Sequence, residues 1–434
     1  MTERLTFIAT CDLVAITRGR SIPSAEFERR ASTGVGWVPA DLALTTFGAI
    51  ADPNPFGSLG DTRLIPDTRA RIVLPGRGDG PPTDLVLASI VEPDGRPWAC
   101  CPRTALVDAV DRLDALGVRV VAAFEQEFGL SGLAGTAAPF SIEAHRLAEP
   151  FGSELVGRLA EAGLEPETWL PEYGAGQYEI TLRPTDPLTA ADRAILLRAL
   201  VRDLAAGHGL RATFAPLVRP DAVGNGVHVH LSLWSPDGRP LTLDPMTGQL
   251  SETAGRFAAG ILAHADAAVA WTAPSVISAL RFGPHRWSSS AAFLGRQNRE
   301  AMVRLCPTPT VGGADPATSA NLEYRAADGT ANPWLALAAI LHAGADGLER
   351  ALPAAPLIDG DLEEIDPAER ARLGIRELPP DVETALAAFE ADDSATNWFA
   401  ADLRTTHLAI RRTEAALLAD LDPGERCARY ADVI

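Results

Sequence analysis

Four short stretches of this chain look like β-strands, yet each carries acidic, histidine or arginine side chains that a protein core accepts only with partners. They are residues 124–128, 177–180, 227–230 and 322–325. Side chains two positions apart on a strand point to the same face of the sheet. The pairs predicted to share a face are Glu125 with Glu127, His228 with His230, and Glu323 with Arg325.

Two further carboxylates, Glu172 and Glu179, flank a Gly-Ala-Gly turn and can reach the same place. Five carboxylates and a histidine brought together would repel one another unless cations lay among them. Oxygen ligands with a single imidazole suit Mg²⁺ or Mn²⁺ better than a metal that prefers thiolates. The sequence therefore predicts an enzyme with a divalent-metal site.

Two of these stretches also have a simpler explanation. Glu125 and Glu127 would be solvated acids if their segment were an edge strand. His228 and His230 would be hydrogen-bonded core residues if they bound nothing, and one of them could bind metal while the other contacts substrate or phosphate. The sequence alone leaves these alternatives open.

The composition narrows the class of protein. With 434 residues, the chain is long for one core and predicts two domains, or one large domain with an appendage. Its net charge of −19 argues against general binding to nucleic acid or to anionic membranes. The five cysteines include no Cys-x-x-Cys pair, and we expect reduced thiols in a cytoplasmic protein without a signal peptide. Residues 257–280 are expected to form a buried helix rather than a membrane span.

The chain contains no lysine, and arginine accounts for all 38 of its Lys+Arg residues. A P-loop lysine, a Schiff-base lysine and a lysine nucleophile are therefore excluded. One 24-residue stretch contains Arg281, Arg286, Arg296, Arg299 and Arg304. Guanidinium groups suit carboxylates and phosphates, although a solvated basic surface would give the same pattern. With the acid clusters, these arginines predict phosphoryl chemistry in which metal ions and arginine share the charge.

The apolar pattern predicts an α+β protein with two parts. Residues 1–95 are rich in glycine, proline and β-forming residues, with strands at about 5–16 and 85–91, and predict a small, mostly β domain. Residues 96–434 alternate helices with strands. The helices are predicted at about 104–117, 150–162, 188–207, 251–272 and 334–348 and from 378 onward, and the strands at about 118–128, 177–183, 211–217, 226–234 and 321–326.

Six sequence blocks occur in an order that resembles the glutamine synthetase superfamily. They are Glu125-x-Glu127; Glu172 with Gly-x-Gly-Gln-x-Glu179; Asn225-Gly-x-His228-x-His230-x-Ser232; Arg281-x-x-Pro284; Asn298-Arg299-Glu300-Ala301 with Arg304; and Glu323-Tyr324-Arg325 leading to Ala331-Asn332-Pro333. The complete order is far more specific than any one block. With a compatible N-terminal part and ending, the resemblance covers nearly the whole chain.

The resemblance implies an N-terminal β-grasp domain (residues 1–95) and a catalytic domain (residues 96–434) with a curved antiparallel sheet flanked by helices. It implies ATP and two or three Mg²⁺ or Mn²⁺ ions as cofactors, with glutamate and an amine as substrates. In the implied reaction, ATP phosphorylates the γ-carboxylate of glutamate and an amine then displaces the phosphate. Sites in this family form between subunits of stacked hexameric rings, so a homo-oligomer, a dodecamer, is implied.

The motif positions also imply residue roles. Glu127, Glu172 and Glu179 would hold the metal nearer glutamate, and Glu125, His228 and Glu323 the metal on the ATP phosphates. Arg281 would bind the glutamate carboxylate, with Gly224 in the glutamate loop. Arg299, Arg304 and Arg325 would meet the phosphates and the transferring group, and His230 would lie at the nucleotide.

The chain departs from the family where ammonia-using members bind ammonium. Trp287 stands where those members carry an acidic flap residue, and residues 34–39 hold no clear match to a second acidic motif. Loss of two carboxylates removes a binding site for a small cation, while the tryptophan ring offers an apolar or cation–π contact surface. We therefore expect an organic amine, bulky or aromatic rather than polycationic, and a γ-glutamyl amide as product. This resembles the γ-glutamylpolyamine, γ-glutamylethanolamide and γ-glutamylanilide synthetases of the superfamily.

Two further departures concern ATP and regulation. Asn321 stands where many members have an arginine near the nucleotide phosphates, so we expect a rearranged contact there. Residues 352–378 show no match to the tyrosine-bearing loop that some bacterial members adenylylate, so we expect no such regulation. The competing hypotheses are a true glutamine synthetase using ammonia, a ligase for a different acid, and a catalytically silent structural or regulatory relative.

Overall fold

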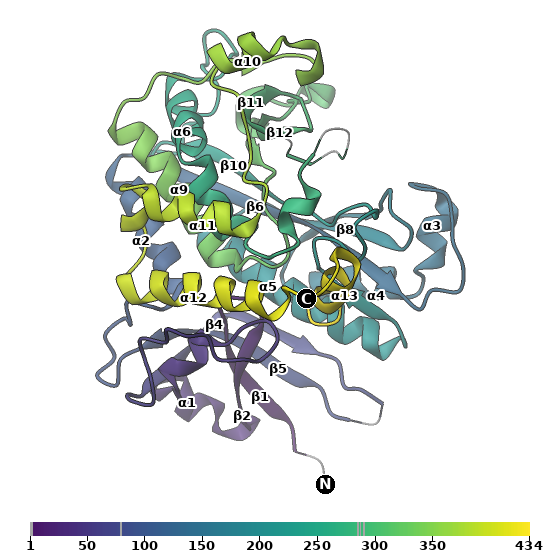
Figure 1. Ribbon diagram of the computed structural model, residues 1–434. Helices are drawn as coiled ribbons and strands as arrows, with labels where there is room; N and C mark the ends of the chain where they lie inside the picture. The colour runs from purple at the N-terminus through teal and green to yellow at the C-terminus, as the bar shows by residue number, and fades with distance from the viewer. Residues whose placement is uncertain (1–2, 79, 284–285, 287, 290) are drawn as a thin grey trace.

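The N-terminal part of the chain forms a five-stranded sheet below the rest of the molecule (Figure 1). The computed structural model describes residues 3–434 apart from 79, 284, 285, 287 and 290. The strand order is β2-β1-β5-β4-β3, in which β1 pairs in parallel with β5 and the other pairs are antiparallel. The elements are β1 (Leu5–Cys11), β2 (Thr17–Pro23), α1 (Phe27–Thr33), β3 (Val35–Trp37), β4 (Thr62–Leu74) and β5 (Thr83–Val91). This confirms the expected β-grasp domain.

The strand predicted at residues 5–16 ends earlier, at Cys11, because Asp12 builds a turn. The Asp12 carboxylate accepts hydrogen bonds from the backbone N–H groups of Val14 and Ile16. Such Asx bonding replaces the ladder of a strand. The turn ends where β2 begins at Thr17.

The second part of the chain contains a ten-stranded sheet. Its main order is β14-β11-β12-β13-β10-β6-β8-β7, with β15 on β11 and β9 on β6. The strands are β6 (Arg119–Ser131), β7 (Pro166–Pro171), β8 (Gln177–Leu182), β9 (Arg211–Thr213), β10 (Val227–Trp234), β11 (Ala291–Arg296), β12 (Ala301–Leu305), β13 (Leu322–Tyr324), β14 (Leu357–Ile358) and β15 (Arg376–Glu377). The pairs from β7 through β12 are antiparallel, as expected, whereas β11 pairs in parallel with β12 and β14.

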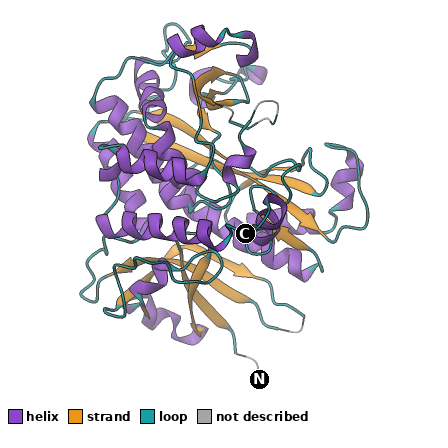
Figure 2. Ribbon diagram, viewed as in Figure 1, coloured by secondary structure: helices purple, strands orange, loops and turns teal. Residues whose placement is uncertain are grey.

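Helices cover this sheet and separate it from the N-terminal domain (Figure 2). They are α2 (Pro102–Ala115), α3 (Ile142–Leu147), α4 (Phe151–Glu161), α5 (Pro187–Gly207), α6 (Glu252–Ala263), α7 (Ala265–Thr272), α8 (Pro316–Ser319), α9 (Pro333–Glu349), α10 (Pro367–Arg372), α11 (Val382–Ala391), α12 (Ala401–Leu417) and α13 (Pro423–Ala431). Helix α9 begins as predicted, because the Asn332 side chain caps the N–H of Leu335 and Pro333 follows. No helix in the described part of the chain is both long and apolar enough to cross a membrane.

Two further predicted elements differ from the structure. The helix predicted at 251–272 is divided at His264 into α6 and α7, because the His264 ring is held by Asp346 and Asp392 at 2.8 and 2.5 Å. The strand predicted at 211–217 stops at Thr213. Beyond it the backbone pairs elsewhere, with Phe214 N–H donating to the Ile434 oxygen.

The domain boundary between residues 95 and 96 remains a prediction. Strand β5 ends at Val91 and α2 begins at Pro102, so the predicted boundary falls in the connection between these two elements.

Candidate active site

The sheet register places the predicted site residues opposite one another. His228 on β10 lies opposite Glu125 on β6, and His230 lies opposite Glu323 on β13. Glu127 on β6 lies opposite Glu179 on β8. Directly opposed residues on neighbouring strands have their side chains in contact distance. Four adjacent strands, β8, β6, β10 and β13, therefore bring these acids and histidines together, as the sequence predicted.

Glu125, Glu127, Glu179 and His228 open onto a cavity of about 660 Å³, whereas His230 and Glu323 are not part of its lining. The lining includes the carboxylates Glu125, Glu127, Glu172, Glu179 and Asp221, the arginines Arg281, Arg286, Arg299 and Arg325, and Gln177, Gly224, His228, Ser288, Phe140, Leu170, Tyr173, Ala222 and Val223. A cavity of this size accommodates a drug-sized ligand. Acidic and guanidinium groups thus face the same space.

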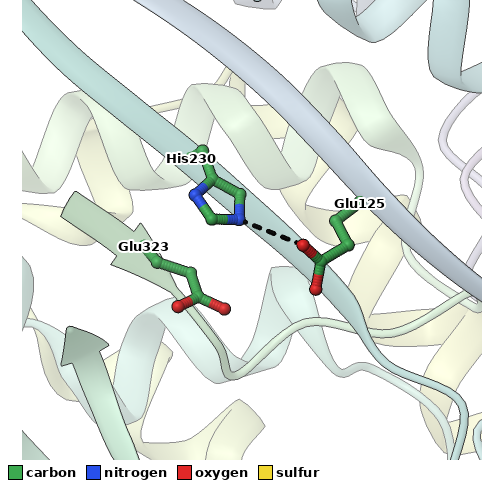
Figure 3. Close-up of side chains that lie close together, drawn as sticks. All are labelled: Glu125, His230 and Glu323. Carbon is green, nitrogen blue, oxygen red and sulfur yellow. Dashed lines mark ion pairs between the residues drawn. The ribbon is translucent and has the colours of Figure 1, made fainter. Parts of the chain in front are cut away.

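One end of the acidic cluster combines carboxylates with imidazole. Nδ1 of His228 lies 2.7 Å from Oε1 of Glu125 and 3.7 Å from Oε1 of Glu323. Nε2 of His230 lies 3.4 Å from Oε2 of Glu125 (Figure 3). Single ligand atoms of Glu125, His230 and Glu323 all lie within 4.8 Å of one another. This oxygen and imidazole set fits Mg²⁺ or Mn²⁺, and both histidines reach it.

The charges in this cluster hold its acids ionised. Burial opposes ionisation of Glu125, but hydrogen bonds from His228 and His230 keep its pKa well below the ordinary value. Burial likewise opposes ionisation of Glu323, but the charges of Arg325 and the two histidines lower its pKa to about 2. Both carboxylates are therefore available as anionic ligands at neutral pH.

The other end of the cluster contains carboxylates without a histidine. Burial raises the pKa of Glu179 to about 10, and the charges of Glu125, Glu127 and Glu172 act in the same direction. Burial and the charge of Glu127 also raise the pKa of Glu172. A divalent cation among these groups would relieve the repulsion, so they fit a metal site.

Glu127 is held in place by neighbours to which the sequence analysis gave no role. Its Oε2 accepts hydrogen bonds from Gly226 N–H at 2.8 Å and from Gln177 Nε2 at 3.2 Å. Gln177 also bonds to Gly224 O and Asn225 Oδ1. The signal was present, because Gln177 is two residues from Glu179 and therefore shares its strand face.

The predicted arginines divide into two groups. Arg281, Arg299 and Arg325 line the cavity, and buried Arg281 donates to Ala327 O at 2.9 Å. Arg304 is absent from the described lining, and its NH1 bonds to Glu323 Oε2 at 2.7 Å from behind. Arg325 pairs with the other oxygen of Glu323. Arg286 lines the cavity, whereas Arg296 pairs with Asp359 at 3.0 Å.

Asn321 bonds to a histidine of the cluster. Its Oδ1 lies 2.9 Å from Nδ1 of His230, while its Nδ2 donates to Ser319 O. Because Oδ1 can only accept, Nδ1 of His230 carries the proton and Nε2 faces Glu125. The predicted amine-site residue Trp287 lies outside the described residues.

The mouth of the cavity has apolar side chains exposed to solvent. Phe140, Tyr173 and Val223 are each at least 40% exposed, and Leu170 lines the same space. Exposed apolar groups at a cavity are typical of a binding site. Asp221 adds a carboxylate to this mouth.

Comparison with known proteins agrees with the fold. The glutamine synthetase N-terminal domain matches residues 2–98 and the glutamine synthetase catalytic domain matches residues 99–422. A gamma-glutamylpolyamine synthetase of Streptomyces coelicolor is 35% identical over 98% of this chain and 92% of its own length. A glutamine synthetase of Halobacterium salinarum is 32% identical over 88% of this chain and 83% of its own length.

Solved structures show the same similarity. A structure described as a novel glutamine synthase homolog superposes with a TM-score of 0.92 at 44% identity, covering 100% of this chain and 99% of its own. A GmaS/ADP complex gives 0.81 at 29% identity, covering 97% and 95%. Both domains match, and the sheet order and the acids and arginines that face one cavity agree with this match. The chain therefore belongs to the glutamine synthetase family of ATP-dependent ligases.

Proposed function

We propose that this enzyme uses ATP to phosphorylate the γ-carboxylate of glutamate and couples the product to an organic amine, giving a γ-glutamyl amide. The observation that carries the proposal is that five carboxylates and four arginines line one cavity. Phosphoryl transfer places negative charge on the transferring oxygens and needs cations already in position. Enzymes of this family use ATP and divalent metal ions, which match that need.

The activation step follows from the chemistry of carboxylates. A carboxylate is a poor electrophile because its leaving group would be oxide, and conversion to an acyl phosphate supplies a better one. Glu127, Glu172 and Glu179 would hold one metal ion, and Glu125, His228 and Glu323 another; bound there, the ions neutralise phosphate charge. Arg281, buried at the end of the cavity beside Gly224, would bind the glutamate carboxylate. Arg299 and Arg325, which line the cavity, would meet the phosphates.

An organic amine is supported by the mouth of the cavity. Phe140, Leu170, Tyr173 and Val223 provide apolar surface for the body of an amine, which ammonium would not use. Asp221 supplies a carboxylate for a cationic amine. The relative described as a gamma-glutamylpolyamine synthetase supports the same class of acceptor.

The test is phosphate release from ATP with glutamate and Mg²⁺ or Mn²⁺ across a panel of amines. The panel contains ammonium, ethanolamine, short alkylamines, polyamines and anilines. We expect one organic amine to give a kcat/KM at least tenfold above that of ammonium, with a γ-glutamyl amide detected by mass spectrometry. A Glu127→Gln variant serves as the control that turnover comes from this cavity.

Each other result selects a different function. Turnover with ammonium alone would mean a glutamine synthetase, the name carried by several relatives. Tight binding of ATP with Mg²⁺ but no turnover would mean a silent relative. Turnover only with another amino acid in place of glutamate would mean that the enzyme is a ligase for that acid.

We also propose a ring-type homo-oligomer with sites between subunits. Val311, Met246 and Leu59 are each more than 80% exposed in one chain, and we expect neighbouring subunits to cover them. Mass photometry should find particles many times heavier than 45.8 kDa. A monomer alone would contradict the proposal.

A further inference from the structure

A second cavity lies between the N-terminal domain and α5. Its volume is about 130 Å³, and it is lined by the β1–β2 turn (Cys11, Ala15, Ile16, Thr17), by α5 including Arg198 and Arg202, and by Gly329. None of the residues that line it also lines the cavity of the candidate active site. Two guanidinium groups one helical turn apart therefore face a small enclosed space.

Arg198 is buried and Arg202 is partly buried, and both differ from most of the buried arginines. Arg103, Arg304 and Arg411 each have a carboxylate oxygen within 3.0 Å. Neither Arg198 nor Arg202 has an ion pair with a carboxylate among the described residues, and no acidic side chain lines the cavity. Burial lowers the pKa of each to about 10, which leaves both charged at neutral pH. A buried charge without a counter-ion is costly.

The neutral partners of Arg198 fix its place. Its Nε donates to Gln126 Oε1, and its NH1 donates to the carbonyls of Gly329 and Ala331. The charge of Asp328 acts on Arg198, but one Asp328 oxygen bonds to Thr330 and its charge also acts on Arg281. Gln126 lies between Glu125 and Glu127, so this guanidinium supports the metal-site strand from behind.

Arg202 is satisfied only in part. Its NH2 donates to the main-chain oxygen of Ile434, whereas its buried Nε has no hydrogen-bond partner in the described structure. Even with a full negative charge on the Ile434 oxygen, only one of the two guanidinium groups would have a close counter-ion. The Cys11 thiol provides none, because burial raises its pKa.

Arg281 is a second example of an arginine that lines a cavity without a carboxylate partner among the described residues. It is likewise buried, has no carboxylate partner among the described residues, and lines a cavity where a substrate carboxylate would bind. By the same physical argument, we propose that Arg198 and Arg202 form a second anion site that binds a small tetrahedral oxyanion, inorganic phosphate or sulfate. The cavity is too small for a nucleotide, since sites for drug-sized ligands occupy about 300–1,000 Å³.

Ala15 offers a matched pair of test variants. It lines the cavity and has a φ of 62°, a conformation in which aspartate and asparagine are both tolerated better than alanine. Ala15→Asp adds an internal carboxylate that competes with the anion, whereas Ala15→Asn has the same shape without the charge. Ala15 is not part of the candidate active site, so both variants should keep the fold and the turnover of the enzyme.

The first measurement is sulfate and phosphate binding by calorimetry at constant ionic strength, with chloride as the reference salt. We expect Ala15→Asp to weaken binding at least tenfold, and Ala15→Asn to bind like the unmodified enzyme. Arg202→Met should also lose binding, while Arg193→Met, which removes an arginine of α5 that pairs with Glu165 and lies outside this cavity, should not. Equal affinities in all four variants would overturn the proposal.

Crystals soaked in selenate locate the anion independently of the active site. The expected result is an anomalous peak between Arg198 and Arg202 that is missing in Ala15→Asp crystals. A peak at the active-site arginines alone would contradict the second site. Neither experiment depends on the amine or on turnover, so the result is independent of the proposed function.

Discussion

Glu179 is a buried carboxyl group surrounded by other carboxyl groups. Its pKa is raised to about 10, so it holds its proton at neutral pH when no cation is present. Only the ionised form can bind a metal ion, and the proton therefore competes with the metal at every pH below about 10. Metal affinity should therefore rise with pH across the neutral range, because the Glu179 proton is removed more easily at higher pH.

This competition gives a first prediction. Binding of Mn²⁺ at pH 8 should release about one proton per active site, measured by calorimetry in buffers of different ionisation enthalpy. Glu179→Gln should abolish the release and weaken binding roughly tenfold or more. Glu165→Gln, which changes an exposed surface acid, is the control and should leave both unchanged. Proton release that persists in Glu179→Gln would show that another group holds the proton.

Arg281 carries a second prediction at the residue scale. Its planar guanidinium can bind a carboxylate through two parallel hydrogen bonds, which an ammonium group cannot reproduce. Arg281→Lys should raise the KM for glutamate roughly 100-fold and leave the KM for ATP within about twofold. Arg296→Lys, in a partly exposed pair with Asp359, is the control. An unchanged KM for glutamate would remove Arg281 from the substrate site.

The convergence of the site residues could be predicted from the sequence, but their individual contacts could not. Strand periodicity alone places Glu125 with Glu127 and His228 with His230. The direction in which Arg304 turns depends on side-chain packing around Glu323, which periodicity does not describe. The link from Asn321 to His230 joins residues 91 positions apart, and only the sheet register reveals it.

At the scale of elements, α2, α5 and the N-terminal sheet are joined through one buried arginine. Arg103 at the start of α2 forms two hydrogen bonds with Asp192 on α5, at 3.0 and 2.7 Å. It also bonds to Asp67 on β4 and Ser89 on β5. Trp334 of α9 donates to the same Asp192. This network fixes the orientation of the elements behind the site.

Arg103→Lys tests that network. Lysine keeps the charge but loses the paired geometry, so the free energy of unfolding should fall by about 1–3 kcal/mol. Urea denaturation measures the change, and Arg96→Lys in an exposed pair with Asp94 should leave the free energy of unfolding unaltered. Equal stability of both variants would mean that the bidentate geometry contributes little.

Most elements follow from local sequence signals, and the exceptions have tertiary causes. Asn332 and Pro333 predict the start of α9, because helix capping depends only on residues next to one another in the sequence. The break at His264 is not local, since Asp346 and Asp392 reach it from α9 and from the segment after α11. Apolar periodicity continues across the break, so a single helix was the natural prediction and was wrong.

At the scale of the whole molecule, the last helices hold the N-terminal domain. Helix α12 runs along the upper side of the N-terminal sheet (Figure 1). Its fully buried Arg411 and Glu414 pair at 3.0 Å, Arg411 donates to Leu13 O, and Glu414 accepts from Thr46 N–H. The ion pair itself lies within α12, and its hydrogen bonds to Leu13 and Thr46 connect this helix to the N-terminal domain.

Breaking this pair should destabilise the whole chain. Glu414→Leu leaves Arg411 buried without its partner and should cost about 3–5 kcal/mol in the free energy of unfolding. The double variant Arg411→Met with Glu414→Leu should recover most of that loss, because no uncompensated charge remains. Thermal and urea unfolding measure both. A double variant as unstable as the single one would show that packing, rather than charge, dominates here.

The exclusive use of arginine in the cavity has a consequence for the reaction intermediate. Guanidinium groups stay protonated at neutral pH and do not attack acyl phosphates, whereas an unprotonated lysine would. Every cationic side chain that lines the described cavity, apart from His228, is an arginine, and the chain has no lysine at all. A γ-glutamyl phosphate formed there would meet no lysine amine of this chain, so the intermediate cannot be lost as an amide on a lysine side chain before the acceptor amine binds.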